Sequence, residues 1–348
     1  MHLSSRLLAA AGVRAHPARQ DPGQPGHDPG QIAGARRPAR RWRARAAVAV
    51  AAVAVPLLAG AAPALAASDP AATAPTTGHV YWSTVDFNGL AGTIGRANLN
   101  GTMANQNFIS GAAQPFASPA VAVDAAHIYW ADNRAGTIAR ANLDGTGVDQ
   151  SFITRISISS TGFGSSLWVA VDAAHIYWAN SATGTIGRAN LDGTHVNQKF
   201  ITGLGIPLGV AVDAAHVYWA DNLGTIGRAN LDGTGVDQSF IPFPVTPTGG
   251  VAVDAAHVYW ANGQTIGRAN LDGTGVDQSF ITGAGAPNGV AVDAGHVYWA
   301  NLFAFSTRTG SQSWAIGRAN LDGTAVNLTF ITGASQPIGV AVDHTASP

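Results

Sequence analysis

The sequence has 348 residues, a formal net charge of −1 at pH 7 and no cysteine, which excludes both a disulfide framework and a thiol nucleophile. The near-neutral total conceals two segments: residues 1–66 hold nine arginines and two aspartates, whereas residues 67–348 hold nine arginines and one lysine against eighteen aspartates. The acidity of the second segment argues against nucleic acid as a partner, because nucleic acid requires a basic surface.

The first segment has the residue order of a secretory signal. Residues 1–35, rich in Pro, Gly and Gln, are predicted to be a disordered N-terminal extension. Residues 36–66 begin with six arginines, continue with the apolar run 46–58 and end with Ala64-Leu65-Ala66. Because a signal peptide has a basic, then an apolar, then a small-residue region, this order predicts a signal peptide cleaved after Ala66. Residues 67–78, with Pro70 and Pro75, are predicted to be a flexible linker.

Export would make the mature chain a secreted or cell-surface protein. The alternative is an uncleaved anchor, but the apolar run is mostly Ala and Val and contains Pro56, whereas a membrane span needs ~20 strongly apolar residues. Arg40-Arg41-Trp42 leaves open whether the general or the twin-arginine pathway exports the chain. We expect no membrane span after cleavage, and we expect the mature chain to be a monomer.

The region 79–348 repeats one tetrapeptide. His-(Val/Ile)-Tyr-Trp begins at His79, His127, His175, His216, His257 and His296. Its tryptophans, 39 to 48 residues apart, are Trp82, Trp130, Trp178, Trp219, Trp260 and Trp299. A period of this size indicates a repeat architecture, in which each unit buries its apolar face against its neighbours.

Each repeat has the pattern of four short strands. In the fourth copy, the apolar run 208–213 is followed by the turn Ala214-Ala215 and by the β-branched and aromatic segment 216–220. The segments 225–231 and 237–241, separated by the tight-turn pair Asp232-Gly233, complete the unit. Four antiparallel strands at this period are typical of a β-propeller blade.

The sequence therefore predicts an all-β fold, a six-bladed β-propeller of four-stranded antiparallel blades over residues 79–348. The first copy has no inner strand before His79, and the inner-strand run 339–343 at the other end has no copy after it. We expect the ring to close when this C-terminal strand pairs into the first blade.

The fourth copy also resembles a known repeat. Tyr218-Trp219-Ala220-Asp221, followed by the run 226–234 and preceded by the run 207–213, resembles the YWTD repeat, the class B repeat of low-density lipoprotein receptors. The resemblance covers residues 79–343 and implies a six-bladed propeller. The chain departs from the motif in its last position, which is Asp132 or Asp221 in two copies and Asn180, Asn262, Asn301 or Thr84 in the others. A looser similarity is to bacterial propellers that include a streptogramin lyase and lactonases.

Two charged positions recur in every copy, and we interpret them as structural contacts between blades. They are Arg96, Arg140, Arg188, Arg228, Arg268 and Arg318, and Asp124, Asp172, Asp213, Asp254, Asp293 and Asp343. Charge-assisted hydrogen bonds would offset the cost of partly burying these groups. The alternative is an axial cation held by the aspartates, because calcium prefers oxygen ligands.

Other motifs suggest metals less strongly, so no metal or cofactor is predicted. The repeated histidines lie on the turn between the first and second strands, where we expect a packing or capping role, because metal ligands must converge. The segment Asn142–Asp149 resembles a calcium loop but lacks the alternating oxygen ligands and terminal Glu, which favours a hairpin turn.

Function is expected where the copies differ. The turns between the first and second strands and between the third and fourth strands are nearly identical in all copies; we call their side of the ring the uniform face. The loops between the second and third strands and the connections between blades vary, and they share the other side, the variable face. The insertions 155–168 and 302–314 lie there, and the predicted binding residues are Phe163, Trp168, Asn288, Phe303, Phe305, Arg308 and Trp314.

These aromatics suit a binding hot spot or stacking on a sugar ring, although they could instead fold back over a blade edge. No nucleophile, base and orienting group can be assigned from spacing, so no catalytic residue is predicted. The sequence favours a secreted, non-enzymatic binding module for a protein, peptide or wall polysaccharide. The alternatives are a metal-dependent lyase or lactonase with a site at the channel mouth, and a structural component of a surface coat.

Overall fold

The computed structural model describes residues 78–85, 92–113, 120–158, 166–242, 247, 249–305 and 312–343. The chain separates into two units, Met1–Ser68 and Asp69–Pro348, and every described residue belongs to the second. The predicted extension, the signal peptide and all of the linker except Gly78 lie outside the described residues. In the described ranges every regular element is a strand, and no helix is long and apolar enough to cross a membrane.

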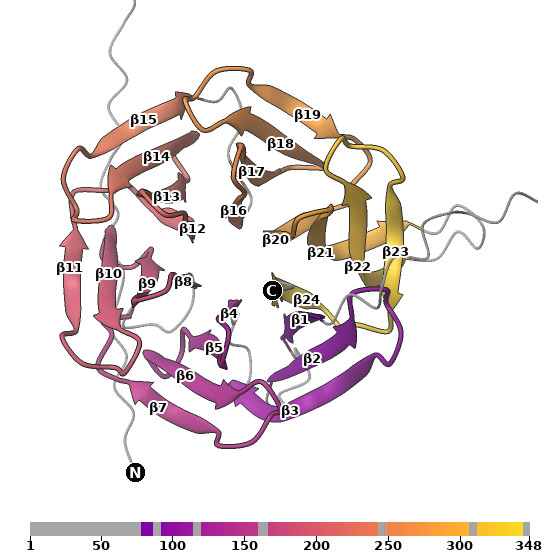
Figure 1. The fold of residues 1–348 in the computed structure, drawn as a ribbon, viewed down its shortest axis with the longest axis horizontal. Helices are drawn as coiled ribbons and strands as arrows, with labels where there is room; N and C mark the ends of the chain where they lie inside the picture. Colours follow the sequence, from indigo (N-terminus) through magenta and orange to yellow (C-terminus); the bar gives the residue numbers. More distant parts are fainter. Residues whose placement is uncertain are drawn as a thin grey trace, which may run out of the picture. The chain divides into compact units, whose positions relative to one another are not determined.

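Twenty-four strands form six four-stranded sheets arranged as a ring of blades (Figure 1). Blade 1 has β24 (Pro337–Val342), β1 (His79–Thr84), β2 (Gly92–Asn98) and β3 (Asn105–Ala113). Blade 2 has β4 (Val121–Val123), β5 (His127–Asp132), β6 (Thr137–Asn142) and β7 (Asp149–Ile153). Blade 3 has β8 (Leu167–Val171), β9 (His175–Asn180), β10 (Thr185–Asn190) and β11 (Asn197–Ile201).

The remaining three blades repeat this order from the inner to the outer strand. Blade 4 has β12 (Pro207–Val212), β13 (His216–Asp221), β14 (Thr225–Asn230) and β15 (Asp237–Pro242). Blade 5 has β16 (Val251–Val253), β17 (His257–Asn262), β18 (Thr265–Asn270) and β19 (Asp277–Ile281). Blade 6 has β20 (Pro287–Val292), β21 (His296–Phe305), β22 (Gln312–Asn320) and β23 (Asn327–Thr332). All neighbouring strands within a blade are antiparallel, as for the four strands of blade 4.

The ring closes as the sequence predicts. The C-terminal strand β24 pairs antiparallel with β1, with Val342 opposite Val80 and Ala341 opposite Tyr81. Figure 1 shows the yellow β24 beside the indigo β1 at the inner edge of blade 1. The two ends of the propeller thus complete one sheet, and the fold prediction is confirmed.

Apolar wedges between neighbouring blades hold the ring together. In the wedge between blades 4 and 5, Tyr218 and Ile226 of blade 4 pack with Val251 and Trp260 of blade 5. Six wedges of this kind occur, including the one between blade 6 and blade 1, where Tyr298 packs with Trp82. The six Tyr-Trp pairs are fully buried, and burial of such large side chains is a major source of stability.

The position opposite each tryptophan on the third strand must be small. Trp219 lies in register with Gly227, where a Cβ atom would be only 2.2 Å from Cε2 of the indole. Four other blades also have glycine here, at Gly95, Gly187, Gly267 and Gly317. Blade 2 differs, because Ala139 lies opposite Trp130.

Candidate functional site

The six repeated arginines form one belt of contacts around the ring. Each donates a hydrogen bond from Nη1 to a leucine carbonyl oxygen of the next blade, at 2.8–3.3 Å. In blade 4, Arg228 donates to Leu271 of blade 5 at 3.0 Å, and its Cζ lies 3.9 Å from the ring centroid of Phe240. The contact from Arg318 to Leu99 links blade 6 to blade 1, so the belt is continuous where the last blade meets the first.

The six repeated aspartates bond within their own blade, which differs from the expectation that both charged sets link blades. Asp213 accepts hydrogen bonds at Oδ1 from the backbone N–H groups of Ala215 and His216, both at 2.7 Å. Its Oδ2 accepts the hydroxyl of Tyr218 at 2.9 Å. The carboxylate therefore ties the inner strand of a blade to the second strand, across the turn on the uniform face.

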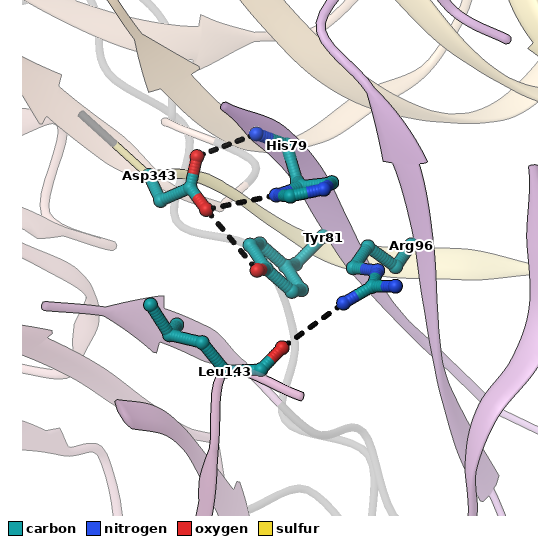
Figure 2. A network of polar contacts seen from close by, with 5 residues as sticks. All are labelled: His79, Tyr81, Arg96, Leu143 and Asp343. Atoms are coloured by element: carbon teal, nitrogen blue, oxygen red, sulfur yellow. Dashed lines mark hydrogen bonds and ion pairs between the residues drawn. The ribbon is translucent and has the colours of Figure 1, made fainter. Parts of the chain in front are cut away.

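The same set of contacts joins the last strand, β24, to the first strand, β1, in blade 1 (Figure 2). Asp343 follows β24, and its Oδ2 lies 3.1 Å from both Nδ1 of His79 and the hydroxyl of Tyr81 on β1. Asp343 is only 5% exposed. Figure 2 also shows Arg96 reaching away from this cluster to the carbonyl of Leu143 in blade 2, at 3.0 Å.

These contacts change the acidities of the paired groups. Burial, together with the charge of the neighbouring aspartate and its hydrogen bond, raises the pKa of all six tyrosines. Burial also raises the pKa of Asp293, but the contacts with the His296 ring, the Gly295 N–H and the Tyr298 hydroxyl outweigh burial and lower this pKa to about 2. Both shifts keep the carboxylate charged and the phenol neutral near pH 7.

A third set of contacts, which the sequence analysis missed, runs around the outer rim. Side-chain amides on four outer strands donate to carbonyl groups of the preceding blade, as Gln238 does to Gly203 at 3.0 Å. The others are Gln106 to Thr332, Gln150 to Gly111 and Gln198 to Arg155. In these copies a Gln stands two positions before the Phe-Ile pair of the fourth strand. This recurrence could have predicted the contacts of the outer rim.

On the variable face, two buried carboxylates organise the loops. Asp221 accepts N–H groups from Gly205 at 2.9 Å, Ile206 at 3.2 Å and Leu223 at 3.0 Å, and it is 2% exposed. Asp132 accepts the N–H groups of Arg134 and Ala135, both at 2.9 Å. The final aspartate of the YWTD-like motif therefore fixes loop backbones where this chain retains it.

Trp168 lies near the start of β8, where the inner strands of the six blades approach one another. The equivalent positions in the other blades are Ala120, Gly209, Gly250, Gly289 and Gly339, where the backbones approach so closely that a Cβ at Gly289 would lie 2.7 Å from the Ile338 carbonyl oxygen. The indole of Trp168 extends from blade 3 to blade 5, because its Cζ3 would lie 3.1 Å from a Cβ at Gly250. It is half-buried and packs on the cores of both wedges that flank blade 3.

Asn288 lies beside the same glycines. Its carbonyl oxygen accepts the Gly250 N–H at 2.8 Å, and its Oδ1 would lie 2.7 Å from a Cβ at Gly249. The structure thus brings Trp168 and Asn288 close to one pair of neighbouring glycines, Gly249 and Gly250.

The other predicted binding residues belong to blade 6 or lie outside the described residues. Trp314 lies on β22 and is 41% exposed. The backbones of Phe303 and Phe305 belong to β21, which continues beyond the length of the other second strands and pairs Phe305 with Gln312 of β22. The insertion after residue 301 therefore lengthens the hairpin of β21 and β22. Phe163, Arg308 and the side chains of Phe303 and Phe305 lie outside the described residues.

Two exposed aliphatic side chains were not predicted from the sequence. Leu223, in the loop between β13 and β14, is 72% exposed, and Ile206, just before β12, is 42% exposed. Both belong to the loops that Asp221 fixes. Their sequence context of Gly and Asn indicates only a turn, so the exposure of these side chains could not be read from the pattern.

The two faces differ in exposed charge. The uniform face exposes a row of carboxylates next to its turns, at Asp144, Asp149, Asp192, Asp232, Asp237, Asp272, Asp277 and Asp322. On the described part of the variable face both aspartates, Asp132 and Asp221, are buried, and the exposed ionisable side chains are Arg134 and Arg155. Across the described ranges, no three His, Cys, Asp or Glu side chains are grouped so as to hold a metal ion.

Comparison with known proteins identifies the repeat and the fold. The family model of the low-density lipoprotein receptor repeat class B matches residues 174–214, which run from blade 3 into blade 4. A chain in the crystal structure of a nidogen–laminin complex is similar with 20% identity and a TM-score of 0.58, covering 76% of this chain and 98% of that chain.

Two enzymes are also among the similar structures. A gluconolactonase from Xanthomonas campestris is 17% identical over 64% of this chain and 78% of its own, with a TM-score of 0.48. Virginiamycin B lyase from Staphylococcus aureus is 17% identical over 64% of this chain and 73% of its own, with a TM-score of 0.47. No curated protein sequence matches this chain.

Proposed function

We propose that this chain, a six-bladed β-propeller of the YWTD (low-density lipoprotein receptor class B) repeat family, is a secreted, non-enzymatic binding module whose variable face takes a protein partner. One observation carries the proposal: side chains that occur in one blade only, Trp168 and Trp314, are presented on the variable face of a ring whose other contacts repeat six times. Recognition by loops on a rigid scaffold is the usual arrangement for such folds.

Trp168 provides the centre of the binding face. One side of its indole packs on the apolar cores that flank blade 3, so its position is fixed before any ligand arrives. A large aromatic side chain held in place contributes contact area with little loss of conformational entropy, which is why tryptophan is enriched in interface hot spots. The adjacent amide of Asn288 supplies a donor and an acceptor beside the indole.

A protein is the favoured partner class. The similar chain in the nidogen–laminin structure comes from a complex between proteins, and the exposed side chains of the described variable face include the aliphatic Ile206 and Leu223. Secretion is supported by the signal-like order of residues 36–66. A peptide or a wall polysaccharide would be the other outcome of a binding experiment.

The alternative of a metal-dependent lyase or lactonase receives no support from the channel mouth. Its six ring positions are Ala120, Trp168 and four glycines, and none of these side chains can ligate a metal or transfer a proton. No observation on the described residues favours this second function.

The test is affinity capture with the full chain from secreted proteins and cell-wall fragments. A triple variant, Trp168→Ala, Phe303→Ala and Trp314→Ala, is used beside it after circular dichroism has confirmed that it folds. The control variant, Val236→Ser and Val276→Ser, changes two side chains of the uniform face that are 43% and 41% exposed. We expect a protein that the parent and the control retain and the triple variant loses. Retention by all three, or by none, would contradict the proposal.

A further inference from the structure

We propose that Ile206 and Leu223 form an apolar anchor site on blade 4, and that this anchor takes an uncharged, apolar polypeptide segment of a partner protein. The inference rests on the proposed function, since it names further residues and the partner chemistry of the same variable face.

The two side chains are unusually exposed for their type. Leu223 is 72% and Ile206 is 42% exposed, although leucine and isoleucine are among the residues most often buried in folded proteins. Ile206 immediately precedes Pro207, and the two blade connections of equal length have Ala286 and Gln336 at that position. On the described part of the variable face, the exposure of large aliphatic groups is therefore a property of blade 4 and is not imposed by the repeat.

Ile206 and Leu223 lie next to each other although they belong to different loops. The N–H of Asn222 donates to the Ile206 carbonyl oxygen at 3.1 Å, which joins the two loops directly. A Cβ at Gly205 would lie 2.8 Å from Cδ1 of Leu223, so the leucine side chain covers the glycine that precedes Ile206. Leu204, in the same loop as Ile206, belongs to the core of the blade 3–blade 4 wedge, on which Trp168 also packs.

Asp221 holds both loops in this arrangement and is the positioning residue of the anchor site. Its Oδ1 accepts the N–H groups of Ile206 and Leu223, and its Oδ2 accepts the N–H of Gly205. Hydrogen bonds to a buried carboxylate are stronger than neutral ones, so the loop backbones are fixed before binding. A prearranged apolar surface loses less entropy when a partner docks.

The charge of the site selects the chemistry of the partner. The loops 202–206 and 222–224 contain no ionisable side chain, and Asp221, the carboxylate that binds their backbones, is buried and satisfied by three N–H donors. A charged segment placed here would lose its hydration without gaining an opposite charge, whereas an apolar segment would not.

The same argument disfavours the uniform face of a second copy of this chain as the occupant. The exposed valines of its uniform face lie among exposed carboxylates; Val236, for example, is next to Asp237 and near Asp232. Stacking that face on the anchor would bury carboxylates against an uncharged aliphatic surface, which is costly. A separate protein with an uncharged apolar segment is the occupant that fits.

The test selects ligands from a phage-displayed library of random peptides, with the full chain immobilised. Enriched peptides are then synthesised, and their dissociation constants are measured by fluorescence polarisation for five proteins: the parent, Leu223→Ser, Asp221→Asn, Trp168→Ala and the matched control Val236→Ser. The control removes a valine that is 43% exposed on the opposite face of the same blade. Asp221→Asn is tolerated by the fold, because Asn180, Asn262 and Asn301 occupy the same position in three blades.

We expect the selected peptides to be rich in large apolar residues and poor in charged ones. Leu223→Ser should weaken their binding about tenfold or more, as is usual for an interface hot spot. Asp221→Asn should weaken it by a smaller factor, because an amide cannot accept all three N–H groups, and Val236→Ser should leave it unchanged.

Three results would overturn the inference: selection of acidic or basic peptides, equal binding to the parent and to Leu223→Ser, or no enrichment over the starting library. Peptides that bind Leu223→Ser normally but not Trp168→Ala would overturn the anchor site and leave the proposed function standing. Enriched peptides that bind equally to both of those variants would contradict both proposals.

Discussion

The uniform and variable faces belong to the same strands but differ in how often their contacts repeat. On the uniform face each blade makes the same bonds, as Asp213 does with Tyr218, so an altered contact would still have five equivalents. On the variable face the side chains of Trp168 and Leu223 have no equivalents. Repeated contacts stabilise the ring, and the loops that occur once are therefore free to specialise in recognition.

The largest effect should follow from opening the ring. Deletion of residues 338–348 removes nearly all of β24, leaves the inner edge of β1 unpaired and deletes Asp343. Because every blade depends on its neighbours, we expect loss of cooperative unfolding and aggregation, measured by calorimetry and light scattering. Deletion of residues 344–348 alone is the control and should leave the unfolding temperature unchanged. A soluble, cooperatively folded product of the longer deletion would show that ring closure is dispensable.

A substitution on the arginine belt should have the next largest effect. Arg228→Ala removes a charge-assisted hydrogen bond to Leu271 and the contact with the Phe240 ring. We expect a loss of about 2 kcal/mol in the free energy of unfolding, measured in urea. Arg155→Ala on the variable face is the paired variant, and it should lose little, because Arg155 is exposed. Equal losses of free energy in the two variants would contradict the expectation that the repeated arginine contacts stabilise the fold more than exposed side chains of the variable face do.

Acid should lower the free energy of unfolding, because it protonates the repeated aspartates on the uniform face. The pKa of Asp293, about 2 in the folded protein, is below the ordinary value of about 3.9 in an unfolded chain. The carboxylate therefore stabilises the fold fully above about pH 4, and this contribution, roughly 2 kcal/mol, is lost as the pH falls from about 4 to about 2. Urea unfolding at pH 7, 4 and 2.5 measures this loss. In Asp293→Asn, the free energy of unfolding should fall less steeply as the pH is lowered. If that variant loses as much free energy of unfolding as the parent between pH 4 and pH 2.5, the stabilising role of the Asp293 carboxylate is contradicted.

The smallest expected effect concerns residues in the left-handed backbone region. His195, on the uniform face, has φ 54° where three other copies have Gly147, Gly235 and Gly275, and Arg155, on the variable face, has φ 61°. Glycine adopts this region without steric strain, so His195→Gly and Arg155→Gly should each raise the free energy of unfolding by about 0.5–1 kcal/mol. Thermal unfolding measures both, and a destabilised Arg155→Gly would show that its side chain supports the fold.

The repeated parts of the molecule were predictable from the sequence, and the single-copy parts were predictable only in part. The Tyr-Trp positions, the four strands of a blade and the pairing of β24 with β1 follow from a pattern that occurs six times, and each is observed. The partners of Asp213 were not predictable, because the sequence does not distinguish a bond to Tyr218 in the same blade from one to an arginine. The exposure of Leu223 depends on how two loops meet, which no local pattern records.

The extension of β21 and β22 could have been recognised. Leu302–Phe305 continues the apolar and β-forming character of the second strand past the usual turn position, and such a continuation is typical of a longer hairpin. The sequence analysis places both large insertions among the variable loops, whereas residues 302–305 and 312–314 belong to the hairpin of β21 and β22.

The most direct test of the binding face is hydrogen–deuterium exchange of the full chain with and without its captured partner. The account predicts added protection in the loops 202–206 and 222–224 and around Trp168, with little change in the turns that carry Asp213 and Asp232. Protection confined to those turns of the uniform face would contradict the assignment of the variable face as the binding surface.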